Sequence, residues 1–194
     1  SDPYLLSDFT DRFCLKDQIH SIYLIYSDFI DKLDYKIGVR TEYSNIIGSQ
    51  DETHNNFKDN YVNLFPSLTI SYNFTSDNKI SIGYNRNINR PLLIQFNPFL
   101  RQYSTYSFSS GNPKIKPAYS DRISIIKMFE LFNLPFNSTL SFMRINDAIG
   151  QPTKLQSNGN SISKSENNEN VSTLGFTINS FLEITKKTSL SYFI

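Results

Sequence analysis

The sequence lacks several features that would place it in a common class of protein. Cys14 is the only cysteine among 194 residues, which excludes an intrachain disulfide framework and a cysteine-rich metal site. The formal net charge is only +1, so no basic excess exists to neutralise the phosphates of a nucleic acid. No apolar run approaches the roughly 18 residues of a membrane-spanning helix. We therefore expect no nucleic-acid partner and no helical membrane anchor.

Motifs that mark an enzyme or a cofactor site are missing as well. The sequence has no glycine-rich phosphate loop, no nucleophile elbow and no helical His-Glu pair. His20 and His54 have no second His or Cys at the spacing of metal ligands. We therefore predict that the chain is not an enzyme and has no catalytic, metal-binding or cofactor-binding residues.

The sequence is instead rich in aromatic and small polar residues that alternate along the chain. It contains 12 Tyr and 16 Phe but no Trp, together with many Ser and Asn. Ile80, Ile82 and Tyr84 alternate with polar residues, and residues 34–43 and 67–74 repeat this pattern. Because side chains of a strand point alternately to its two faces, this period of two predicts strands with one apolar and one polar face.

Eight such strands are predicted, joined by connections that are alternately short and long. The predicted strands cover residues 17–27, 33–45, 61–74, 79–88, 118–131, 136–146, 170–183 and 187–194. The long connections are residues 46–60, 89–117 and 147–168. A soluble β-sandwich would have mostly short connections. Outer-membrane barrels have short periplasmic turns and long extracellular loops, so the alternation favours a barrel.

The predicted fold class is therefore all-β, an antiparallel up-and-down transmembrane β-barrel meander. The apolar faces should point to lipid, while Lys36 and Arg40 should line a wet concave side. Strict alternation places Arg86 and Arg144 on the apolar face, near the outer ends of their strands. A β-bulge would turn their side chains to the polar face instead.

With short turns facing the periplasm, both chain ends would lie outside the cell. We therefore interpret residues 1–194 as a single incomplete barrel segment, about eight strands of a larger barrel.

Several motifs, in order and at fitting distances, resemble a known family. They are residues 35–43, 61–67, 80–91, 97–99 and 111–120; the last of these reads Gly-Asn-Pro-Lys-Ile-Lys-Pro-Ala-Tyr-Ser. The sequence is similar to the outer-membrane β-barrel domain of TonB-dependent receptors of the Bacteroidetes type. It differs from the family pattern in having Ile and Ala in the last motif where Leu and Glu are usual.

The resemblance implies a location in the bacterial outer membrane, in contact with its lipid, and a role in the wall of a receptor for active uptake of a scarce nutrient. A TonB-type energising partner would act through a plug domain, which this sequence does not contain. The external small ligand is not identified by the sequence. Two alternatives stay open: a passive outer-membrane channel or scaffold barrel, and a soluble secreted β-domain acting as an adhesin or glycan binder.

Ligand contact is expected at the outer ends of the strands and in the long loops, because loops on a rigid scaffold carry recognition. Arginine and aromatic side chains supply most binding hot spots. The candidate ligand-facing residues are Arg86, Asn87, Arg90, Gln95, Arg101 and Tyr103. The alternative is that Asn87 and Arg90 only hold the 29-residue loop to the barrel wall.

Overall fold

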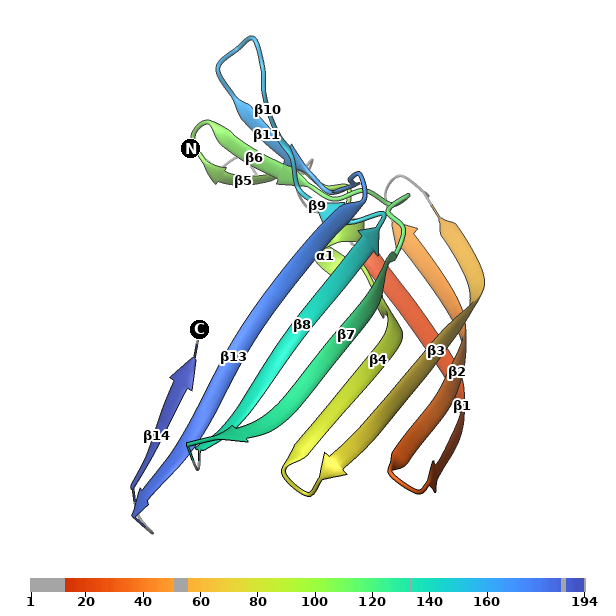
Figure 1. Cartoon of the computed structure of the whole chain (residues 1–194). Coiled ribbons are helices and arrows are strands. Elements are labelled where there is room, and N and C mark those ends of the chain that lie inside the picture. Colours follow the sequence, from red (N-terminus) through yellow and green to blue (C-terminus); the bar gives the residue numbers. More distant parts are fainter. Residues whose placement is uncertain (1–12, 51–55, 133, 186–187, 194) are drawn as a thin grey trace, which may run out of the picture.

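A computed structural model describes residues 13–50, 56–132, 134–185 and 188–193. Within these ranges, eight long strands form one antiparallel sheet (Figure 1). In sheet order the strands are β1 (Phe13–Ile30), β2 (Leu33–Gln50), β3 (Phe57–Thr75), β4 (Asn78–Asn89), β7 (Ala118–Leu131), β8 (Leu134–Asn146), β13 (Val171–Thr185) and β14 (Thr188–Phe193). Each long strand pairs with the next long strand along the chain, so the predicted meander of eight strands is confirmed.

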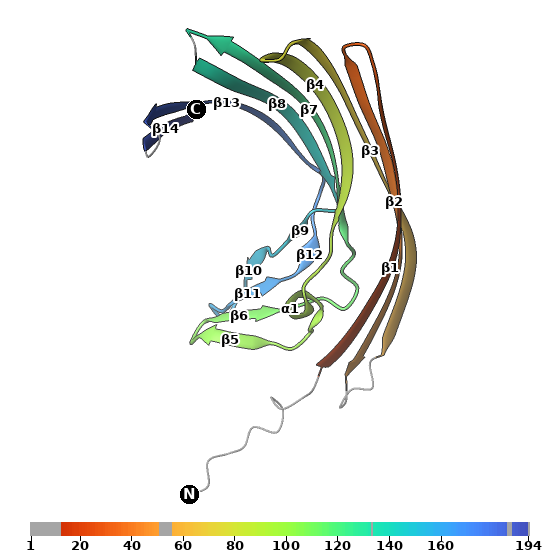
Figure 2. The same cartoon turned by 90° about the horizontal axis from the view of Figure 1, so that it is seen from below.

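The sheet curves into an open arc with β1 and β14 at its two edges, and the two longest connections fold back inside the arc (Figure 2). These connections contain short elements: α1 (Leu93–Phe96), β5 (Arg101–Ser104), β6 (Ser107–Ser110), β9 (Ile149–Gly150), β10 (Thr153–Leu155), β11 (Ser161–Lys164) and β12 (Glu166–Asn167). No helix among the described residues is long and apolar enough to cross a membrane.

The strand register separates an apolar face from a polar face across the whole sheet. Residues directly opposite each other on paired strands lie on the same face. One continuous row consists of Ile37, Leu68, Tyr84, Ile123, Phe142 and Leu174. The adjacent row on the opposite face consists of Lys36, Thr69, Gly83, Ser124, Ser141 and Gly175. The predicted division into faces is therefore confirmed.

The polar face is the concave one. Ile46 lies on the same face of β2 as Lys36 and Arg40. Its side chain packs against Phe96 of the loop that folds inside the arc. The apolar face is therefore convex, and there Ile82 and Leu174 are 52% and 73% exposed. The soluble-domain alternative required these side chains to be buried against a second sheet, so that alternative is wrong.

The first of the three long connections is shorter than predicted. Residues 46–60 were expected to form a loop, but β2 continues to Gln50 and β3 begins at Phe57, paired in register out to Gly48 opposite Phe57. A strand of 18 residues, the length of β2, spans roughly 60 Å, whereas 9–11 residues are enough to cross a bilayer. The outer parts of β2 and β3 thus extend beyond the membrane. They stay paired because Ile46 and Phe57 pack against the neighbouring loop.

Arg86 and Arg144 lie on the convex face. The pairing of β4 with β7 and of β7 with β8 has no register shift, so no bulge turns either arginine inward. Both are close to the loop end of their strands. At that height an arginine on the lipid side of a barrel costs only about 0–1 kcal/mol, compared with about 2–4 kcal/mol at the midplane.

Candidate site at the loop end of the barrel wall

A buried carboxylate on the concave face holds the start of the 90–117 loop. Glu42 of β2 is 5% exposed, and its Oε1 lies 3.0 Å from Nε of Arg40. Arg90, the residue after β4, donates from Nη2 to Oε2 of Glu42 and also, at 3.3 Å, to Oγ of Ser44. Burial alone would lower the pKa of the Arg90 guanidinium, but the Glu42 carboxylate and, to a smaller extent, Tyr61 together raise it. The contact of Arg90 with Glu42 fastens the loop to the wall.

The loop then packs its apolar side chains onto the extended ends of the strands. Phe96 of α1 and Ile115 are 4% and 5% exposed, and both contact Ile46 of β2. The ring of Phe57 stacks on that of Phe96 with centroids 5.7 Å apart. Gly111 donates its backbone N–H to a loop carbonyl at 2.7 Å. The loop is consequently an ordered layer with a small core of its own.

The two long connections are joined to each other. β6 of the first pairs in parallel with β11 of the second, within a four-stranded sheet ordered β10-β11-β6-β5. Asn167 adds a second junction, because its side-chain amide exchanges two hydrogen bonds of 2.9 Å with the backbone of Lys116. The two loops therefore form one connected layer over the concave side.

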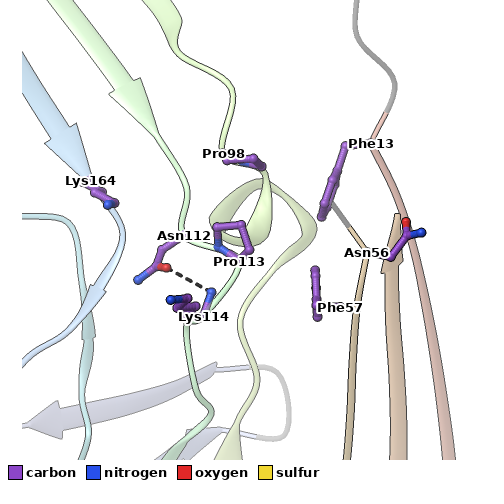
Figure 3. A pocket seen from close by; sticks show the side chains of 8 residues that line it. All are labelled: Phe13, Asn56, Phe57, Pro98, Asn112, Pro113, Lys114 and Lys164. Carbon is purple, nitrogen blue, oxygen red and sulfur yellow. Dashed lines mark hydrogen bonds between the residues drawn. The ribbon is translucent and has the colours of Figure 1, made fainter. Parts of the chain in front are cut away.

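Between this loop layer and the wall lies a pocket of about 470 Å³. Its lining residues are Phe13, Asn56, Phe57, Pro98, Asn112, Pro113, Lys114 and Lys164 (Figure 3). The rings of Phe13 and Phe57 are stacked with centroids 6.4 Å apart and form the wall side. Lys114 and Lys164 are on the loop side, and both are exposed. The pocket thus combines flat apolar surfaces with two positive charges.

The family model that describes the "Outer membrane protein beta-barrel family" matches residues 1–194. The chain belongs to this family. Its location is therefore the bacterial outer membrane, as predicted. The narrower resemblance to receptors of the Bacteroidetes type stays a prediction. No curated protein matches the sequence significantly.

Solved structures of a siderophore receptor and of two metal transporters have the same fold. The siderophore receptor PirA from Pseudomonas aeruginosa has a TM-score of 0.60 at 15% identity, with 94% of this chain and 43% of PirA covered. The FrpB iron transporter from Neisseria meningitidis has a TM-score of 0.61 at 14% identity, covering 90% and 25%. The copper transporter OprC has a TM-score of 0.67 at 13% identity, covering 91% and 30%. The chain thus spans less than half of each of these structures.

The six predicted ligand-facing residues do not form a single site in the structure. Arg90 makes the ion pair described above. Gln95 accepts the backbone N–H of Leu92 at 2.8 Å and closes the first turn of α1. Arg101 of β5 donates to the carbonyl of Ile94 at 3.3 Å. These three side chains stabilise the loop layer.

Of the other three, Arg86 and Asn87 line one cavity, whereas Tyr103 lies apart from them. Asn87 is exposed and lines a cavity of about 180 Å³ along the concave wall, together with Tyr23 and Phe65. Tyr103 of β5 is 67% exposed at the edge of the loop sheet. Arg86 has the strand register of the convex face, and it lines the same cavity as Asn87. Ligand contact by any of the six stays a prediction.

Sequence reasoning missed the residues that line the larger pocket. Phe57 was placed in a loop, although it is paired in β3, and its ring faces the loop layer. Lys114 directly follows the Gly-Asn-Pro turn of residues 111–113, which entered above only as part of the family resemblance. Lys164 is far away in sequence, and only the pairing of β6 with β11 brings it near Lys114. The turn motif was thus the one signal that could have pointed to the pocket. His54 lies outside the described residues.

Proposed function

We propose that this chain is part of the wall of an outer-membrane receptor that actively imports a scarce nutrient. The single observation that carries the proposal is the pocket of about 470 Å³ between the barrel wall and the loop layer, at the end that faces outward in this class of protein. A site there meets an external ligand before the ligand enters the barrel. The plug domain and remaining strands would be supplied by other parts of the protein.

The pocket favours a ligand with a flat apolar body and negative charge. Phe13, Phe57 and Pro113 supply flat surfaces, and the ammonium groups of Lys114 and Lys164 supply positive charge. Structures with the same fold are described as a siderophore receptor, an iron transporter and a copper transporter. We therefore propose an anionic metal chelate as the first ligand class to test, and a TonB-type partner as the source of energy.

The test is uptake of radiolabelled iron and copper chelates by cells that carry the full-length protein, compared with cells that lack it. Uptake should require the protein and should stop when a protonophore collapses the inner-membrane potential. Lys114→Gln and Lys164→Gln should weaken binding, because each removes one positive charge from the pocket. The matched control is Lys154→Gln, since Lys154 is an exposed lysine of β10 outside the pocket.

Two results would contradict the proposal. Uptake that persists with the protonophore would identify a passive channel instead. Equal binding by the Lys114, Lys164 and Lys154 variants would show that recognition does not use this pocket.

A further inference from the structure

Strands β3 and β4 separate toward the loop end of the wall (Figure 1). Within the described ranges, their pairing runs from the short turn to Ser67 opposite Asn85 and goes no further. β4 nevertheless stays paired with β7 as far as Asn89. The next residue of β3 is Pro66, which has no backbone N–H to donate to a ladder. Above Ser67 the wall is therefore split, because no ladder joins β3 to β4.

A cavity of about 180 Å³ lies at the base of this split. Pro66 and Ser67 line it from β3, and residues 85–87 line it from β4. Gly38 of β2 is also part of the lining, and a Cβ there would be 2.6 Å from Oγ of Ser67. Pockets for drug-sized ligands occupy roughly 300–1,000 Å³, so this smaller cavity has room for one small group.

The cavity is positively charged, because the guanidinium groups of Arg40 and Arg86 line it and no described carboxylate does. Nε of Arg40 lies 3.0 Å from Oε1 of Glu42, and its guanidinium lies 4.6 Å from the ring centroid of Phe65. The second oxygen of Glu42 accepts a hydrogen bond from Arg90, which does not line the cavity. Glu42 is thus shared by two arginines and leaves the cavity with excess positive charge.

Arg86 is held at the split without a counterion. Among the described residues, no carboxylate lies within 4.0 Å of its guanidinium. Asp121, directly opposite it on β7, accepts the hydroxyl of Tyr84 at 2.8 Å instead. The Arg86 guanidinium lies 5.3 Å from the ring centroid of Tyr119, whose hydroxyl donates to Oδ1 of Asn63 on β3 at 2.8 Å. A half-buried guanidinium in this position is stabilised by an anion that replaces its lost hydration.

We propose that this cavity binds the carboxylate or phosphate group of one small anion. The Arg86 guanidinium donates two parallel hydrogen bonds to two of its oxygens, a geometry that a lysine lacks. The amides of Asn85 and Asn87 are two residues apart on β4, so they lie on one face and donate to the same group.

The site is separate from the larger pocket. Along β2, Gly38 is ten residues from Gly48, which is directly opposite Phe57 of that pocket. Ten residues of a strand rise roughly 33 Å. The proposal therefore does not depend on the transported nutrient or on Lys114 and Lys164.

The experiment is isothermal titration calorimetry of the full-length protein in mild detergent, with succinate and inorganic phosphate as probes at constant chloride concentration. The wild-type protein should bind both anions. Arg86→Gln should lower the affinity for each about tenfold or more, because the hydrogen bonds of a charged group are lost. Arg144→Gln is the matched control, since Arg144 is an exposed arginine of β8 outside the cavity. Lys114→Gln should leave this binding unchanged, which separates the site from the nutrient pocket.

Heat-modifiable migration on a gel verifies that each variant is folded. Succinamide, the uncharged diamide of the same size, should not bind. Equal affinities of Arg86→Gln and Arg144→Gln for succinate would overturn the proposal, and so would saturable binding of succinamide as tight as that of succinate. No saturable binding of either anion by the wild-type protein would overturn it as well, since the charge of Arg86 would then be met within the protein.

Discussion

Replacing Glu42 by Gln should release the 90–117 loop from the barrel wall without unfolding the sheet. The substitution keeps the shape of the side chain but removes the charge that holds Arg40 and Arg90. The side chain of Glu42 is 7% exposed, while those of Arg40 and Arg90 are 32% and 22% exposed. Breaking a fully buried ion pair costs about 3–5 kcal/mol, and an exposed pair contributes about 0–1 kcal/mol. Because both arginines are partly solvated, we expect a loss of about 2 kcal/mol, between these limits.

The assay is amide hydrogen exchange of the full-length protein, measured by mass spectrometry on peptides that cover residues 90–117. The N–H groups of Gly111, Asn112 and Ile115 are bonded to loop carbonyls, so they report loop opening. A loss of about 2 kcal/mol corresponds to roughly 30-fold faster exchange through that opening. The peptides of β7 and β8 should exchange at their original rates.

The control is Glu130→Gln, which removes an exposed carboxylate at the short-turn end of β7. Adding Arg90→Gln to Glu42→Gln should accelerate exchange little further, because the two residues act as one pair. Unchanged exchange of residues 90–117 in Glu42→Gln would refute the argument, since the loop would then be held by its apolar packing alone.

Three further predictions follow from the faces and the loop. Ile82→Lys on the convex face near mid-height should cost about 2–4 kcal/mol and reduce insertion into liposomes, whereas Ser81→Lys on the concave face should insert normally. Gly111→Ala should destabilise the loop by about 1–3 kcal/mol in the same exchange assay, because a Cβ there would be 2.5 Å from two backbone carbonyl oxygens. Deletion of residues 92–110 should abolish ligand binding while the barrel stays inserted and heat-modifiable; undiminished binding would place recognition elsewhere.

The sequence alone was sufficient to predict the meander and its two faces. Alternation with a period of two fixes which side chains share a face once neighbouring strands pair, and the short turns leave little freedom in that pairing. The sequence alone therefore assigns Ile82 and Ser81 to opposite faces. The alternating short and long connections also predicted the outer-membrane fold. Barrels of this class have short turns at the periplasmic end and long loops at the extracellular end.

Only the tertiary structure decided what the long loops do. The loop residues have no regular alternation from which their contacts could be predicted. Those contacts join segments far apart in sequence: Arg90 contacts Glu42, and Lys164 lines the same pocket as Lys114. The sequence placed Arg90 among possible ligand contacts, but its charge is used to hold the loop. The length of β2 and β3 likewise depends on a distant contact, because the ring of Phe57 in β3 stacks on the ring of Phe96 in the loop. Local alternation specifies a strand and its faces, whereas the ends of strands and the surroundings of a loop side chain depend on packing between distant segments.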